Sequence, residues 1–170
     1  LGFNHVVTQF TSHEWAHLEL DSKGRIVPKN ENAFRKLIWL CRFVFKWYAG
    51  ISILYIVIVG SFGYWLLSYN PPKVYVSWES QWLWYITISG INLCLLPFKT
   101  ILLGCQQIKQ VKLAQLIQAI FHSFSIWTVM IMDGMLWALV FSVASALLID
   151  IILILGIFRR FFRTFFFVKV

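Results

Sequence analysis

The stretch MLWALVFSVASALLIDIILILGI, residues 135–157, decides the fold class. It is 23 residues long and contains a single charged residue, Asp150. About 20 mostly apolar helical residues cross the roughly 30 Å of hydrocarbon in a bilayer. Three further stretches meet the same criterion: Ala49–Leu67, Trp82–Leu103 and Leu116–Met132. Because backbone polar groups in lipid must be satisfied within the chain, we predict an all-α, polytopic bundle with these four stretches as spanning helices.

The composition supports one membrane domain over residues 1–170. Of the 170 residues, 59% are hydrophobic and only 13% are charged, whereas about 25% of the residues in a soluble domain are charged. The sequence contains no Gly-rich phosphate loop, no nucleophile elbow and no carboxylate pair, so we predict that the chain is not an enzyme. Its three cysteines lack the spacing of a zinc site, and we expect them to be reduced.

The basic residues predict the orientation of the chain. Residues 1–48 contain seven Lys and Arg, the 68–81 loop contains one, and the connection after the second span adds Lys109 and Lys112 beside Lys99. The tail, residues 158–170, contains four more. The segments predicted on one side of the membrane therefore contain 14 basic residues, and those on the other side contain one. Cytoplasmic segments of membrane proteins are the ones enriched in Lys and Arg. We predict that residues 1–48, the 104–115 connection and the basic tail are cytoplasmic. The net charge of +8 then reflects topology, and we expect no nucleic-acid partner.

The region before the first span is predicted to contain two helical segments. Apolar residues at helical spacing indicate a partial helix over Phe3–Leu20, which lies at a membrane surface or lines a watery cavity. Residues 21–30 form a polar cytoplasmic linker with two helix breakers, Gly24 and Pro28. Glu31–Tyr48 resumes an amphipathic helical pattern that continues directly into the first span.

The first helix contains His13-Glu14-Trp15-Ala16-His17, a match to the H-E-x-x-H zinc-protease motif. Two His four residues apart on a helix can bind one Zn²⁺, and the Glu can act as the base. A third ligand is not evident, because Glu31 is too close in sequence and Glu79 lies on the opposite predicted side. An integral-membrane zinc metalloprotease is therefore an alternative to the main interpretation.

Four polar residues within the spans are candidates for function. Asp150 lies deep in its span, where a charge costs at least about 2.5 kcal/mol, so it faces either a cavity or a hydrogen-bonding neighbour. Lys99 either snorkels to the inner boundary or contacts an anionic substrate. Gln118 and His122 share one face of the third span, where they either line a polar lumen or hydrogen-bond between helices.

Several segments together resemble a known family. They are Leu1-Gly2-Phe3-Asn4, Gln9-Phe10-Thr11-Ser12-His13-Glu14, Phe45-Lys46-Trp47-Tyr48, Leu103-Gly104-Cys105-Gln106-Gln107 and Leu116-Ile117-Gln118. They are similar to bacterial polysaccharide flippases of the O-antigen type, in the multidrug/oligosaccharidyl-lipid/polysaccharide exporter superfamily. The resemblance implies two six-helix lobes around a cavity that opens alternately to each side. Phe3–Leu20 would be the inner end of the second helix, and the four spans the third to sixth.

The resemblance also implies a function. The chain would flip a lipid-linked oligosaccharide across the bacterial cytoplasmic (inner) membrane for O-antigen or other surface polysaccharide synthesis. It would need a missing second lobe or a second subunit, and no cofactor other than a coupling proton or sodium ion. In that setting Lys99 would meet the phosphate and Asp150 the coupling ion, while four residues would bind sugars: Gln9, His13, Gln118 and His122. A small-molecule exporter of the same superfamily and a non-catalytic membrane scaffold are further alternatives.

Overall fold

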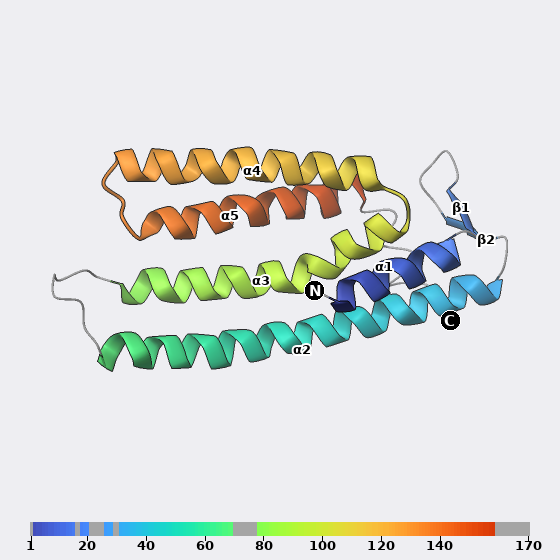
Figure 1. Ribbon diagram of the computed structural model, residues 1–170, viewed down its shortest axis with the longest axis horizontal. Helices are drawn as coiled ribbons and strands as arrows, with labels where there is room; N and C mark the ends of the chain where they lie inside the picture. The colour runs from blue at the N-terminus through green and yellow to red at the C-terminus, as the bar shows by residue number, and fades with distance from the viewer. Residues whose placement is uncertain (1, 16–17, 21–25, 29–30, 70–77, 159–170) are drawn as a thin grey trace.

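The computed structural model describes residues 2–15, 18–20, 26–28, 31–69 and 78–158. In these residues the chain forms a bundle of long helices that run roughly antiparallel (Figure 1). The elements, in order, are α1 (Gly2–Trp15), β1 (Leu18–Leu20), β2 (Ile26–Pro28), α2 (Glu31–Tyr69), α3 (Glu79–Gly104), α4 (Ile108–Ile131), α5 (Trp137–Ile151) and the π-helical η1 (Ile152–Ile157).

The predicted all-α class is confirmed. Within the described residues, four helices are long and apolar enough to cross a membrane: Phe34–Tyr69, Glu79–Gly104, Ile108–Ile131 and Trp137–Gly156. The expected continuity at the first span is also present, because α2 runs unbroken for 39 residues. The third spanning helix begins at Ile108, earlier than the predicted Leu116. Its first two turns contain Lys109 and Lys112. The span was predicted from the length of apolar sequence, and that criterion leaves such charged residues outside the span.

The predicted helix over Phe3–Leu20 is wrong in its last turn. Helix α1 ends at Trp15, and Leu18–Leu20 is instead a strand that pairs antiparallel with Ile26–Pro28. Short runs that contain Ile and Val favour a strand, and Pro28 is tolerated because it lies in a two-stranded ribbon, where every strand is an edge. The predicted 21–30 linker therefore contains a strand, and its other residues lie outside the described chain. So does the basic tail beyond Phe158.

Close contact between α2 and α3 depends on small residues. A Cβ atom at Gly63 would lie 2.1 Å from Cζ2 of Trp82, so only glycine fits beside this ring. The Trp82 Nε1–H donates to the carbonyl of Gly60 at 3.3 Å, and the Ser52 hydroxyl donates to the carbonyl of Gly90. Small residues and interhelical hydrogen bonds are the usual means by which membrane helices approach closely.

Helix α1 packs against one end of α2 and α3 (Figure 1). Val7 is buried against Val44 and Tyr48 of α2, and the Tyr48 hydroxyl donates to the side-chain oxygen of Asn4. On the α3 side, Gly104 lies directly under α1, where a Cβ atom would lie 2.5 Å from that of Thr11. Helix α1 is thus fixed to the bundle by contacts to both helices.

Candidate functional site

Lys99 and Asp150 form an ion pair inside the bundle. The Lys99 Nζ of α3 lies 2.7 Å from Asp150 Oδ2 of α5. The Asp150 side chain is 2% exposed and that of Lys99 is 16% exposed. An isolated charge in the membrane interior is costly, and intramembrane charges are commonly paired with one another. The structure therefore brings together two residues to which the sequence assigned separate roles.

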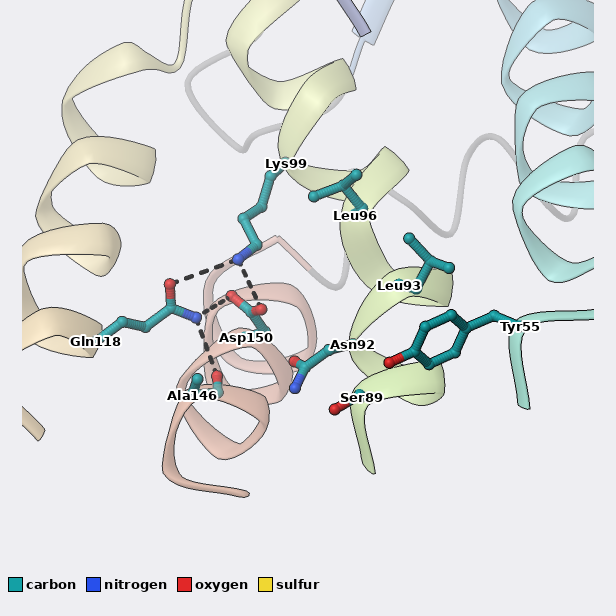
Figure 2. A pocket seen from close by; sticks show the side chains of 9 residues that line it. All are labelled: Tyr55, Ser89, Asn92, Leu93, Leu96, Lys99, Gln118, Ala146 and Asp150. Atoms are coloured by element: carbon teal, nitrogen blue, oxygen red, sulfur yellow. Dashed lines mark hydrogen bonds and ion pairs between the residues drawn. The ribbon is translucent and has the colours of Figure 1, made fainter. Parts of the chain in front are cut away.

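Gln118 of α4 joins the pair (Figure 2). Its Nε2 donates to Asp150 Oδ1 at 2.6 Å and to the carbonyl of Ala146 at 2.9 Å. Its Oε1 accepts from Lys99 Nζ at 3.4 Å. Both carboxylate oxygens of Asp150 thus have a partner, and three helices each contribute one side chain. We call Lys99, Gln118 and Asp150 the charge cluster.

The charge cluster lines one side of a pocket of about 440 Å³ between α2, α3, α4 and α5. The other lining residues are Tyr55, Ser89, Asn92, Leu93, Leu96 and Ala146. The lining residues of α3 recur at intervals of three and four, so they share one face of that helix. Asn92 also donates to the carbonyl of Val143 in α5, at 3.3 Å. The pocket therefore offers hydroxyl, amide, ammonium and carboxylate groups within an apolar bundle.

The pocket extends from the charge cluster toward the middle of α3. Lys99 lies five residues before the end of α3 at Gly104, near the end that α1 covers. Ser89 lies ten residues earlier, which corresponds to about 15 Å along a helix. Figure 2 shows Tyr55 on the side of the pocket away from the cluster, with Ser89 and Asn92 between it and Asp150. Polar groups are thus distributed from the predicted cytoplasmic third of the helix to its centre.

The other predicted pathway residues lie elsewhere. Gln9 and His13 are exposed on α1, and His122 is exposed on α4, so none of the three lines this pocket. Tyr55, Ser89 and Asn92 were not among the sequence candidates. For Ser89 and Asn92 the signal was present in their spacing from Lys99, because three polar residues on one face of an apolar helix indicate a polar cavity.

The H-E-x-x-H motif is described only in part. Glu14 is buried and His13 is exposed, while His17 lies outside the described residues. In the part of the chain that is described, no three His, Cys, Asp or Glu side chains lie together as metal ligands. Because His17 belongs to the motif, the zinc hypothesis stays a prediction.

The fold and the pocket define the class: a polytopic helical membrane protein with a charged, polar pocket within its bundle. Comparisons with known protein families, with curated proteins and with solved structures give no significant match. The assignment to a family of flippases therefore stays a prediction from the resemblance.

Proposed function

We propose that the chain is part of a transporter that moves a lipid-linked oligosaccharide across the bacterial cytoplasmic membrane. The observation that carries the proposal is a charge cluster that lines a polar pocket between candidate spanning helices. Ionisable residues within a membrane mark substrate and ion pathways. The sequence resemblance to polysaccharide flippases supports the same conclusion.

The chemistry of the pocket suits such a substrate. Hydroxyl and amide groups of Tyr55, Ser89 and Asn92 can exchange hydrogen bonds with sugar hydroxyls. Lys99 can bind a phosphate oxygen when it separates from Asp150, and the freed carboxylate can then take up a proton or sodium ion. The lipid tail would stay in the bilayer while two lobes or subunits alternately open the cavity.

Stability alone is a weak reason for the charge cluster. A buried ion pair costs much of its Coulomb energy in desolvation, and apolar replacements of similar volume are often as stable. Lys99 and Asp150 also border a pocket, whereas a purely structural pair needs no adjoining space. Both features favour a role in binding or transport.

Deletion of the gene in its bacterium tests this function. We expect loss of a surface polysaccharide, with accumulation of its lipid-linked intermediate in the cytoplasmic leaflet. The wild-type gene should restore export, and Lys99→Ala and Asp150→Asn should reduce it. Lys112→Ala, which changes an exposed residue of α4, is the matched control. Unchanged polysaccharide in the deletion strain would refute the proposal, as would full export by both pocket variants.

A further inference from the structure

The first half of α2 exposes a row of stacked aromatic side chains. Trp39, Phe43 and Trp47 are 67%, 46% and 53% exposed. Their ring centroids lie 5.6 Å and 6.4 Å apart in sequence order, with interplanar angles of 7° and 14°. We call these three residues the aromatic ladder. An apolar surface of this kind is normally covered by a partner or by lipid.

The aromatic ladder is continuous with the lipid-facing side of the first span. At intervals of three or four residues it is followed by further exposed apolar side chains: Ile51, Leu54, Ile58, Phe62, Trp65 and Tyr69. From Trp39 to Tyr69 the helix rises by about 45 Å. A bilayer with its headgroup regions is about 40–45 Å thick. This face of α2 is thus about as long as the full bilayer is thick, and we infer that Trp39 lies at the level of the inner headgroups. The inner boundary then lies earlier in α2 than the predicted start at Ala49, and exposed Lys46 would extend its ammonium group toward the headgroups.

A groove lies beside Trp39, between α1 and α2. Its volume is about 480 Å³, and the described residues that line it are Phe10, Arg35, Lys36, Trp39 and Leu40. Its surface is almost entirely apolar, so Arg35 and Lys36 line it with their aliphatic stems. Both residues are exposed, which leaves their charged ends free to reach an anion at the edge of the groove, and none of the lining residues is a carboxylate. Because α1 is held against α2 by its contacts to Val44 and Tyr48, both walls of the groove are fixed.

We propose that this α1–α2 groove binds an anionic glycerophospholipid of the phosphatidylglycerol class. Arg35 and Lys36 contact the lipid phosphate, for which a guanidinium offers paired donors. The acyl chains run along the aromatic ladder into the hydrocarbon. Basic pockets at the cytoplasmic ends of membrane helices are suited to anionic headgroups. The inference depends on the membrane placement of α2 and is independent of the proposed transport function.

The apolar floor distinguishes this ligand from a free anion. A soluble phosphate would use only Arg35 and Lys36 and would leave Phe10, Trp39 and the aromatic ladder in water. A lipid satisfies the cations and covers the apolar surface at the same time. The headgroup depth of Trp39 places the groove where such lipids are available.

Lipid titration followed by native mass spectrometry of the purified, delipidated protein tests the site. We expect wild-type protein to retain phosphatidylglycerol in preference to phosphatidylcholine. Arg35→Ala/Lys36→Ala should weaken phosphatidylglycerol binding about 30-fold, the loss expected for two basic side chains near a membrane surface. Lys109→Ala/Lys112→Ala removes the same charge from exposed positions of α4 and should change binding less than about twofold. Circular dichroism confirms that both variants remain helical.

Three outcomes would overturn the proposal. Equal losses in the two double variants would show diffuse attraction instead of a site. Displacement of the lipid by millimolar inorganic phosphate would show a simple anion site. A dimer in the same spectra that excludes lipid and is lost on Trp39→Ala would show that a second copy of the chain covers the ladder. In the absence of a dimer, Trp39→Ala should weaken lipid binding although both cations remain.

Discussion

Removal of one partner from the Lys99–Asp150 pair should destabilise the bundle by an amount that depends on which partner is removed. Lys99→Met leaves a carboxylate that is 2% exposed, with Gln118 as its remaining donor in the charge cluster. Asp150→Leu leaves an ammonium group that is 16% exposed and lies five residues from the end of α3. The long side chain of Lys99 can extend toward the interface, whereas the carboxylate of Asp150 cannot.

These differences set the expected magnitudes. Breaking a buried pair costs about 3–5 kcal/mol. Because Gln118 still donates to the carboxylate, we expect Lys99→Met to lie at the lower end of this range, at about 3 kcal/mol. For Asp150→Leu we expect about 1–2 kcal/mol, because snorkelling rehydrates the lysine. The double variant Lys99→Met/Asp150→Leu leaves no unpaired charge and should lose less than about 1 kcal/mol. The coupling energy of the cycle is then about 3–5 kcal/mol.

The assay is unfolding of the purified protein in one detergent, followed by circular dichroism, for the four members of the cycle. Lys112→Met, at an exposed site on α4, controls for loss of a lysine and should have an effect within about 0.5 kcal/mol of zero. Two results would refute the reasoning. One is additivity of the single variants within about 0.5 kcal/mol, which would show that the side chains do not interact. The other is a larger cost for Asp150→Leu than for Lys99→Met.

Three further predictions follow from the packing and the topology. Gly104→Ala places a Cβ atom 2.5 Å from the Cβ atom of Thr11 in α1 and should cost about 1–3 kcal/mol in the same unfolding assay. The control Gly50→Ala, with open space around it, should stabilise α2 by about 0.5–1 kcal/mol. A stabilising effect of Gly104→Ala would contradict the contact between α1 and α3. Burial, and secondarily the neighbouring Cys41, raises the pKa of the Cys105 thiol well above its usual range. Because the thiol stays protonated, maleimide labelling of Cys105 should stay slow from pH 7 to about pH 9 until the protein is unfolded, and rapid labelling at pH 8 would refute its burial. In intact cells, an impermeant maleimide should label Asp133→Cys and spare Lys109→Cys; the reverse pattern would invert the predicted topology.

The spanning helices could be predicted from sequence because they depend on one local quantity, the length of apolar chain. The end of α1 could not, because Leu18–Leu20 is defined by its pairing with Ile26–Pro28, which no helical periodicity encodes. The start of α4 was predicted too late because the prediction counted only apolar residues. A helix continues beyond its apolar stretch wherever polar residues such as Lys109 still form helical hydrogen bonds.

The charge cluster could be predicted only as separate residues. Lys99, Gln118 and Asp150 were all candidates, yet their contact depends on the rotation of three helices about their axes. Successive residues of a helix are about 100° apart, so small differences in helix phase decide whether two side chains meet. His122 illustrates this point, because it lies one turn from Gln118 but is exposed and does not line the pocket.

The position of the cluster relates it to the arrangement of the helices. Helices α2 and α3 pack along each other, as do α4 and α5, so the described spans form two pairs (Figure 1). Lys99 lies on one pair, while Gln118 and Asp150 lie on the other. Asn92, through its bond to the carbonyl of Val143, makes a second polar contact between the pairs. A change in the angle between the two pairs would therefore alter the ion pair and the pocket together, whereas the apolar contacts within each pair need not change.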